Sequence, residues 1–463
     1  MTDMMPRATA PLDVSALRGR LAGEIVTPAD AEWDVARQAW NLAVDQRPSL
    51  VALPETAADV AEVVRFARAE GLRVAPQGTG HNAHPLGDLE GTVLLKMHRM
   101  TGVEIDPATR VARVRAGAVW IDVVSAAAEY GLAALAGSSP DVGVVGYTLG
   151  GGLSWLARRY GLGANRMLAA EVVTADGEIV RADRGNHPEL FWALRGGGGS
   201  FAAVTAIEIE LFAIPQVHAG ILFFGIERAG EVLHAWRDWV DTVPESVTSV
   251  GRIVRVPPLE EIPEPVRGRD FVVVETISLD GREAADRRLE PLRALGPEMD
   301  THAVVPIEAL SHLHMDPEHP VPGQGDGRLL DVGHDTIDAI LDVAGPGVAS
   351  PLLSIEIRHI GGAARRAGAD HGALARIDAD FAMFAVGMTP DEQMRAAVLA
   401  HLDIVVGATE RWDAGSAYLN FVEKHEDPAR FYPEGVYERL RAVKAHYDPQ
   451  DVFRANHPIP PAR

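Results

Sequence analysis

Cysteine is missing from this chain of 463 residues. Its absence excludes disulfide bridges, thiolate metal sites and cysteine nucleophiles, and it leaves the redox compartment open. Long apolar runs are missing as well, because none reaches the about 18 residues that a membrane-spanning helix needs. Residues 1–20 also lack the uninterrupted apolar segment of a signal peptide. These absences predict a soluble, cytoplasmic protein without a membrane partner.

Positive charge is scarce. Lys and Arg number 43 against 65 Asp and Glu, which gives a formal net charge of −22. Such a chain repels phosphate backbones and anionic lipid, so we expect no nucleic-acid partner. A hydrophobic fraction of 47% and a charged fraction of 23% are those of an ordinary globular protein, and the length allows two or three domains.

The first 214 residues show helices alternating with short strands. Thr56 and Asp59 form the reciprocal pair of a helix capping box, and Gly71 stands where a C-terminal glycine ends the same helix. Ala175-Asp176-Gly177 is a hairpin turn signal. The other elements predicted here are strands at 72–75, 111–115, 171–174, 178–181 and 204–211 and a helix at 120–130.

Residues 215–414 differ because glycine-rich turns become rarer. We expect strands at 220–224, 271–276, 353–358 and 381–386, helices at 230–240, 282–295, 335–343 and 391–405, and loops at 257–265 and 317–327. Residues 415–463 return to well-punctuated structure, with a strand at 418–422 and a helix at 433–445. The chain therefore indicates an α+β nucleotide-type domain at 1–214, an inserted domain at 215–414, and a C-terminal segment at 415–463 that returns to the first domain.

The first of four glycine-rich stretches follows a predicted strand. Residues 77–83 match the dinucleotide fingerprint G-x-G-x-x-A, but that fingerprint must open a helix. Here Pro85 and Gly87 follow at once, so a Rossmann site is not expected. The loop still presents successive backbone N–H groups, which suit an anion. The other stretches lie at 137–143, 146–152 and 195–201; one alone is as well explained as a tight turn, but four together favour a large ligand with a pyrophosphate.

An ordered series of motifs runs along the chain. Its members are Gly78-Thr79-Gly80-His81-Asn82, residues 140–146, Gly150-Gly151-Gly152, residues 159–165, residues 189–199, Tyr418-Leu419-Asn420-Phe421, residues 439–449, and Phe453-Arg454 with residues 459–461. Taken in order, these motifs resemble those of the vanillyl-alcohol-oxidase-type FAD-linked oxidases, particularly the berberine-bridge-enzyme-like and hydroxynicotine-oxidase-like branch. The resemblance implies a two-subdomain PCMH-type FAD-binding domain with an inserted substrate domain of antiparallel sheet plus helices.

In this family the histidine of the first loop is bonded to the 8-methyl carbon of the isoalloxazine, and His81 takes that place. A neutral imidazole is a capable nucleophile near pH 7, although a histidine that merely touches the cofactor is the alternative. Relatives with a second tether carry a cysteine where this chain has Ser139, so we expect mono-covalent FAD. The resemblance assigns to the cofactor His81, Gln77, Gly78, Thr79, Gly80, Asn82, Gly137, Ser139, Val142, Gly143, Gly146, Tyr147, Gly150, Gly151, Gly152, Asn165, Val204 and Asn420.

The catalytic residues implied by the resemblance are Tyr418 and Asn420. Oxidation of an alcohol or amine needs a proton acceptor while hydride leaves carbon for flavin N5. A tyrosine with an ordinary pKa of about 10 is a weak base, so Tyr418 needs a positive neighbour or hydrogen-bond donors; the alternative is a tyrosine that only packs on the flavin. Val142 corresponds to a position near the oxygen-reacting face, where a small aliphatic residue favours an oxidase; ordinary core packing is the alternative.

Further candidates lie in the inserted domain. Glu356, Arg358 and one of His302, His312 or His314 could face the flavin, although each alone is more typical of a solvated strand face. The His312-x-His314 pair has no recognised ligand spacing, so we expect no metal.

The sequence therefore predicts an FAD-dependent oxidase of a small organic molecule, with dioxygen as acceptor. The alternatives are a dehydrogenase, an oxidative cyclase of secondary metabolism, or a flavin- or ligand-binding protein without turnover. Substrate identity, oligomeric state and the catalytic base stay open.

Overall fold

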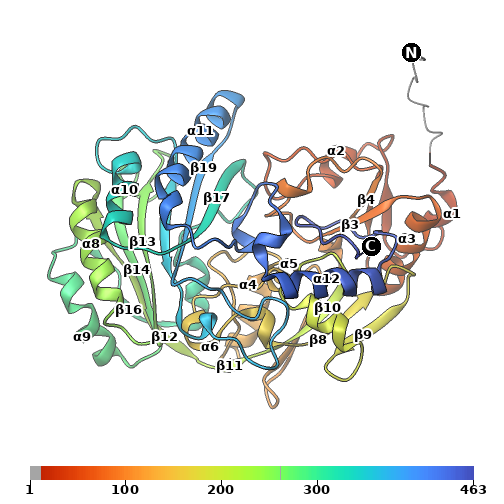
Figure 1. The fold of residues 1–463 in the computed structure, drawn as a ribbon, viewed down its shortest axis with the longest axis horizontal. Coiled ribbons are helices and arrows are strands. Elements are labelled where there is room, and N and C mark those ends of the chain that lie inside the picture. The colour runs from red at the N-terminus through yellow and green to blue at the C-terminus, as the bar shows by residue number, and fades with distance from the viewer. Residues whose placement is uncertain (1–11, 261, 463) are drawn as a thin grey trace.

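The computed structural model describes residues 12–260 and 262–462, so most of residues 1–20, where no signal peptide is expected, lies outside the described residues. Figure 1 shows two regions side by side: a large sheet covered by α8, α9, α10 and α11, and a second region that holds two smaller sheets. No helix of the described residues is long and apolar enough to cross a membrane.

The first small sheet has four strands in the order β1-β2-β4-β3, with β2 and β3 parallel to β4. Helix α3, residues Ala57–Ala69, packs on it and begins at the predicted capping box, where the Thr56 side chain accepts from the Asp59 N–H at 3.1 Å. Gly71 follows the helix end with φ +69°, a conformation that favours glycine. The strands are β1 (Glu24–Val26), β2 (Leu50–Leu53), β3 (Arg73–Gln77) and β4 (Thr92–Lys96).

The second small sheet is antiparallel, in the order β5-β6-β10-β8-β9. It contains the predicted hairpin, and Ala175-Asp176-Gly177 lies in its turn. Its strands are β5 (Val103–Asp106), β6 (Val111–Arg115), β8 (Met167–Val173), β9 (Ile179–Asp183) and β10 (Ala203–Glu210), and helices α4 (Trp120–Ala128), α5 (Val144–Leu149) and α7 (Pro188–Leu194) belong to the same region.

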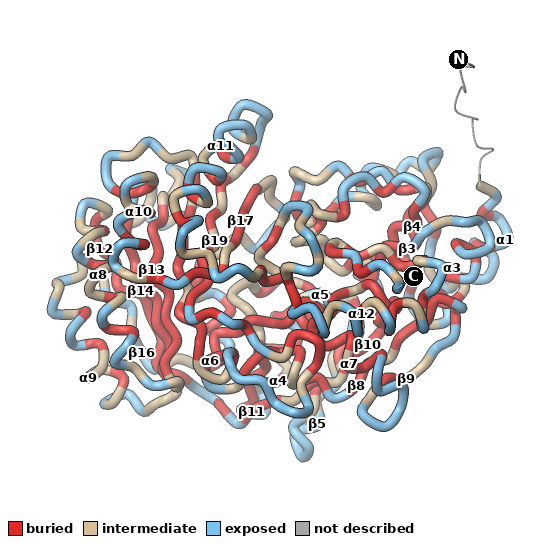
Figure 2. Tube along the Cα trace, in the orientation of Figure 1, coloured by how far each residue is buried: buried red, intermediate tan, exposed pale blue. Residues whose placement is uncertain are grey.

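The large antiparallel sheet has the order β15-β12-β14-β13-β18-β19-β17, with β16 beside β12. Its two short strands are β15 (Met299–Asp300) and β16 (Ala303–Pro306). Figure 2 shows its strands buried, while the outer faces of the helices are exposed. Helix residues such as Trp236 fill the core on one face. On the other face Arg252, Glu356 and Phe384 lie opposite one another on adjacent strands, so their side chains share that face. The main elements are β12 (Gln216–Gly225), β13 (Val247–Arg255), β14 (Asp270–Ser278), β17 (Gly323–Leu330), β18 (Ser354–His359), β19 (Phe381–Met388), α8 (Ala229–Val240), α9 (Arg282–Arg293), α10 (His334–Ala344) and α11 (Glu392–Thr409).

The C-terminal segment contacts the first region again. The Val74 N–H donates to the Val452 carbonyl at 2.8 Å, and Phe453 is buried in the same core as Val74. Helix α12, residues Glu434–Tyr447, carries buried Lys444, whose ammonium donates to the Ser200 carbonyl at 2.8 Å. The division into 1–214, 215–414 and 415–463 stays a prediction.

Two predicted elements are wrong. Residues 418–422 do not form a strand, because Leu419–Phe421 is a short 3₁₀ turn. The expected loop at 317–327 overlaps strand β17, which begins at Gly323. The alternate glycines of β17 are untypical of a strand, so the sequence pattern did not predict it. A Cβ on Gly325 would meet the Phe384 ring at 2.5 Å, and one on Gly327 would meet Phe421 at 2.6 Å. Glycine is therefore retained there for close packing despite its poor strand preference.

Candidate active site

The glycine loop after β3 places His81 beside two other polar side chains. The Thr79 hydroxyl lies 2.7 Å from His81 Nδ1, and Asp141 Oδ1 lies 3.3 Å from Nε2. The Trp40 ring stacks on the imidazole at 4.0 Å with an interplanar angle of 19°. The Trp40 indole N–H also donates to Asp141. His81 is thus held on three sides, by Thr79 of its own loop and by Trp40 and Asp141, which are distant from it in sequence.

Among the glycines of the predicted cofactor loops, Gly146 borders open space, and Gly78 and Gly143 have room for a Cβ atom at ordinary contact distance. At Gly146 no heavy atom of the described residues lies within 4 Å of the position that a Cβ would take. At Gly78 and Gly143 the nearest atoms are 4.0 and 3.7 Å away. Added Cβ atoms would project into this space, so the absence of side chains keeps it free for a large planar or phosphorylated group.

Buried polar atoms without a hydrogen-bond partner in the described part of the chain surround the same loops. Burial of such an atom is costly, so a cluster of them indicates that a polar ligand completes the site. Both donors and acceptors occur, as a nucleotide with ring and phosphate groups requires. The residues present therefore fit FAD. The atoms are Gln77 Nε2, His81 Nε2, Asn82 Oδ1, Trp120 Nε1 and Asp141 Oδ1.

Tyr418 and Asn420 close the site from the C-terminal segment. The Tyr418 oxygen accepts from the Leu153 N–H at 2.9 Å and from Asn420 Nδ2 at 3.2 Å. Asn420 Nδ2 also donates to the Tyr147 carbonyl at 3.0 Å. Burial of the phenol raises the pKa of Tyr418 well above its ordinary value, although both donors and Arg358 act in the opposite direction. The donors that a catalytic tyrosine needs are present, but burial outweighs them.

The three glycines at 150–152 allow close packing of Tyr418, Asn420 and Tyr147, and they do not border the open space at Gly146. A Cβ on Gly150 would lie 1.8 Å from Asn420 Oδ1, and one on Gly151 would lie 2.9 Å from the Tyr418 ring. Tyr147 covers Gly137 and Gly152, and its hydroxyl donates to the Leu135 carbonyl at 3.1 Å. Burial raises the pKa of Tyr147 well above its ordinary value, so its hydroxyl stays protonated.

Other residues of the predicted cofactor set form contacts within the protein. Asn165 uses its amide on the chain at 372–375, donating to the Leu374 carbonyl at 3.1 Å and accepting from the Gly372 N–H at 2.8 Å. Asn82 donates to the Leu419 carbonyl at 3.2 Å and so ties the first loop to the C-terminal segment. Val204 is buried within β10. Gln77 accepts from Gln46, Val142 packs against the core, and Gly80 packs on the Gln77 amide.

Ser139 and its neighbour point to the inserted domain. Both the Ser139 and Ser138 hydroxyls donate to Asp316, and Arg358 Nη2 donates to Ser138 Oγ at 3.2 Å. Arg358 also lies over the rings of Phe421 and Trp155 at 5.5 and 6.0 Å. The Arg358 guanidinium therefore lies between the large sheet and the two segments that carry Ser139 and Tyr418.

A buried charge network lies behind Arg358. His314 Nδ1 is 2.5 Å from Glu275 Oε2, and its Nε2 is 2.6 Å from Glu356 Oε2. Arg358 Nε donates to Glu356 at 2.6 Å, and Arg252 donates to Glu275 at 3.1 Å. The expectation of a solvated strand face at Glu356 is wrong, since that residue is only 2% exposed.

The charges of this network set one another's protonation. Burial and Arg252 oppose a charge on His314, but Glu275, Glu356 and Asp316 prevail and raise its pKa to about 9. Burial likewise opposes ionisation of Glu356, but Arg358 and His314 hold its pKa well below the ordinary value. His314, Glu356 and Arg358 are thus ionised and paired at neutral pH.

The other candidate histidines lie elsewhere. His302 is bound by Asp300 and Thr276 at 2.8 Å each, and burial lowers its pKa to about 4. His312 is exposed and pairs with Glu318 at 2.6 Å. Within the described residues no group of histidine and carboxylate side chains has the arrangement of a metal site.

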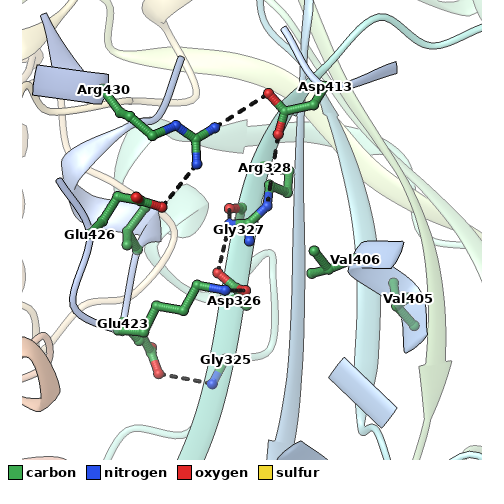
Figure 3. A network of polar contacts seen from close by, with 12 residues as sticks. Gly325, Asp326, Gly327, Arg328, Val405, Val406, Asp413, Glu423, Glu426 and Arg430 are labelled. Carbon is green, nitrogen blue, oxygen red and sulfur yellow. Dashed lines mark hydrogen bonds and ion pairs between the residues drawn. The ribbon is translucent and has the colours of Figure 1, made fainter. Parts of the chain in front are cut away.

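Figure 3 shows how the segment after Asn420 is fastened to β17. The Glu423 carboxylate accepts from the Gly325 N–H at 2.9 Å, and Lys424 donates to Asp326 at 2.8 Å. Burial raises the pKa of Glu423 to about 7, although the Gly325 N–H opposes the shift. These contacts fix the segment that bears Tyr418 and Asn420.

Sequence reasoning did not single out several residues of this site. Trp40, Asp141, Arg252 and Glu275 contact the candidate residues only through the tertiary fold. Asp141 stands inside the motif at 140–146, and that motif was the one available signal in the sequence.

Comparison with known proteins gives consistent matches along the chain. The FAD binding domain family matches residues 48–183, and the berberine and berberine-like family matches residues 417–460. The chain is 30% identical over 457 residues to (R)-6-hydroxynicotine oxidase of Paenarthrobacter nicotinovorans, covering 95% of this chain and 97% of that protein.

Solved structures agree with the sequence matches. The crystal structure of 6-hydroxy-D-nicotine oxidase from Arthrobacter nicotinovorans superposes with a TM-score of 0.82 and 28% identity, covering 96% of this chain and 98% of that one. The glucooligosaccharide oxidase of Acremonium strictum, described with a 6-S-cysteinyl, 8α-N1-histidyl FAD, has a TM-score of 0.82 at 22% identity, covering 97% and 100%. The second likeness concerns the fold.

Proposed function

Because the chain belongs to the FAD-linked oxidoreductase family of the berberine-like and 6-hydroxynicotine oxidases, we propose that it oxidises a small organic alcohol or amine and passes the electrons to dioxygen. FAD, bonded once to the protein through His81, supplies the hydride acceptor N5 and the centre that dioxygen reoxidises. A second tether is excluded at Ser139, because a hydroxyl is a far poorer nucleophile than a thiolate.

One observation carries this proposal. Five buried polar side-chain atoms on or beside the glycine loops form no hydrogen bond in the described part of the chain, and Gly146 of these loops borders open space. A finished structural core leaves few such atoms, whereas a cofactor site without its cofactor leaves them together. The ligand-binding alternative without turnover is disfavoured, because Tyr418 and Asn420 form a hydrogen-bonded pair beside Gly150 and Gly151.

Tyr418 is the proton acceptor that we propose for the substrate. Two donors already point at its oxygen, and Arg358 adds positive charge nearby, so all three stabilise the phenolate. The remaining direction around the oxygen, taken by its own hydrogen when the phenol is neutral, is where a substrate O–H or N–H would lie. Because burial raises the pKa of Tyr418, the active phenolate becomes more abundant as pH rises.

The network behind Arg358 positions that residue. Glu356 holds the guanidinium, His314 holds Glu356, and Glu275 holds His314. Such a chain fixes a buried cation without leaving any member unpaired. The rings of Trp155 and Phe421 pack against the Arg358 guanidinium and help to hold it in place.

The test is a visible spectrum of the purified protein, followed by acid denaturation and a search for flavin fluorescence on the protein band in denaturing electrophoresis. Yellow protein with fluorescence on the wild-type band, absent from His81→Ala, is expected. Colour that acid releases from the wild type would remove the covalent link. A colourless protein that FAD cannot reconstitute would refute the function.

A further inference from the structure

Asp141 and Trp40 both contact the His81 imidazole. A histidine that only binds the flavin would need neither contact. Asp141 Oδ1 and His81 Nε2 are 3.3 Å apart without the alignment of a hydrogen bond, and neither atom has another partner among the described residues. Both side chains are only about a fifth exposed, at 22% and 21%. A buried carboxylate oxygen and a buried imidazole nitrogen that face each other at this distance need only a small shift to bond.

The protonation of the pair follows from the donors available. Burial opposes ionisation of Asp141, but the contact with His81 and the indole N–H of Trp40 hold its pKa below the ordinary value. An ionised carboxylate only accepts, so the imidazole nitrogen that faces it is the one that carries hydrogen. Nδ1 is then the nitrogen with a free lone pair, at present occupied by the rotatable Thr79 hydroxyl.

We propose that Asp141 activates His81 for attachment of the flavin, by holding the Nε2 proton so that Nδ1 is the nucleophile, while Trp40 positions both side chains. This inference rests on the proposed tether at His81. Positive charge that develops on the imidazole as Nδ1 forms its bond would be stabilised by the carboxylate and by the face of the Trp40 ring.

The reaction balances with dioxygen as the oxidant. A bond forms between His81 Nδ1 and the 8-methyl carbon, and one C–H bond of that methyl group breaks. The methyl hydrogen leaves as a proton, and the electron pair of its bond reduces the isoalloxazine. The Nε2 proton leaves through Asp141. Dioxygen then takes the two electrons and two protons and leaves as hydrogen peroxide, which restores the oxidised ring.

The experiment compares the wild type with Asp141→Asn, which keeps the shape and an oxygen for the Trp40 indole but removes the charge. Asp106→Asn is the matched control, because Asp106 is an exposed carboxylate that accepts only from a nearby turn. Each protein is produced with little riboflavin and incubated in air with added FAD. Absorbance after gel filtration gives total bound flavin, and intact mass after acid denaturation gives the tethered share over time.

We expect Asp141→Asn to bind FAD as the wild type does but to tether it about 100-fold more slowly, the lower range for loss of a general base. Asp141→Glu should recover part of the rate, and Asp106→Asn all of it. Trp40→Phe, which keeps a stacked ring but frees Asp141, should tether more slowly than the wild type.

Tethering of Asp141→Asn at the wild-type rate would overturn the inference and leave the proposed function intact. Loss of all flavin from that variant would also overturn it, because Asp141 would then be a binding residue. A wild type that binds FAD without ever tethering it would refute the His81 link itself, and a wild type that binds none would refute the proposed function.

Discussion

The glycine-loop region and the charge network of the inserted domain are both polar interiors, but their polar groups are satisfied differently. Around His81, five buried polar atoms form no hydrogen bond in the described part of the chain, although two of them, His81 Nε2 and Asp141 Oδ1, face each other at 3.3 Å. Around His314, carboxylates and cations pair with one another at 2.5–3.1 Å. The first region is complete only with a ligand, whereas the second is complete in the protein alone.

The difference shows how the two parts of the site act. A region whose polar groups lack hydrogen bonds is stabilised when a ligand supplies them, so the glycine-loop region is suited to bind the cofactor. Removing one member of a paired, buried charge network destabilises the protein, so the network around His314 is suited to fix the positions of its side chains. Arg358 and the Ser138–Asp316 contact join the two, because they reach from the network to the loop that precedes Asp141.

The largest effect is expected at Glu356, where removing charge leaves His314 and Arg358 as buried cations. Glu356→Gln should lower the free energy of unfolding by about 3–5 kcal/mol. Denaturant unfolding followed by far-UV circular dichroism measures the change. Glu283→Gln, which removes an exposed partner of Arg287 on α9, should change it by less than about 1 kcal/mol. Equal stability of the two variants would contradict a paired, rigid network.

Tyr418→Phe should reduce kcat/KM at neutral pH by about 100-fold or more, because the phenol oxygen is lost as proton acceptor. In the wild type kcat/KM should rise with pH, since burial raises the pKa of Tyr418 and the phenolate fraction grows about tenfold per pH unit below it. Steady-state rates with a substrate that the enzyme oxidises, measured across pH 6–10 (about the accessible range), check both the effect of the variant and the pH dependence. A wild-type profile that stays flat would assign the base elsewhere.

Gly146→Ala tests whether the glycine-loop region binds the cofactor. The added methyl group meets no described atom within 4 Å, and alanine favours helix α5, so the protein without flavin should be as stable as before or slightly more. FAD binding should weaken at least about tenfold, since a methyl would occupy space taken by the cofactor. Titration in a His81→Ala background keeps binding reversible. Gly407→Ala on α11, equally free of neighbours, is the control; unchanged affinity of both variants would mean that Gly146 does not border the cofactor.

The smallest effect concerns Glu423, whose carboxylate accepts from the Gly325 N–H of β17. Its folded-state pKa of about 7 lies above the ordinary 4.5, so the folded protein holds a proton that the unfolded chain releases. Stability is therefore full below about pH 4.5 and is lost as pH rises toward 7, by about 1 kcal/mol after allowance for solvent screening. Unfolding midpoints at pH 5 and 7.5 (about the two ends of this window) measure it. Glu423→Gln should remove this part of the slope; an unchanged slope would place it on other groups.

Much of the secondary structure follows from local sequence. The Thr56 capping box, the Ala175-Asp176-Gly177 hairpin and the helices of the inserted domain are local signals, and the structure confirms them. The family resemblance is confirmed by the matches at both ends of the chain. Glycine-rich β17 failed as a prediction because its residues are chosen for close packing on Phe421, which lies almost a hundred positions later.

Sequence by itself determined the family, the cofactor class and the loop that carries His81, because those depend on residue types at fixed local spacing. Only the tertiary structure decided that Asp141 and Trp40 flank His81, that Asn165 spends its amide on the chain at 372–375, and that Glu356 is buried in a paired network. Hydrogen bonds and ion pairs act over a few ångströms, and the sheet registers that bring such groups within that range are set by packing across the whole fold.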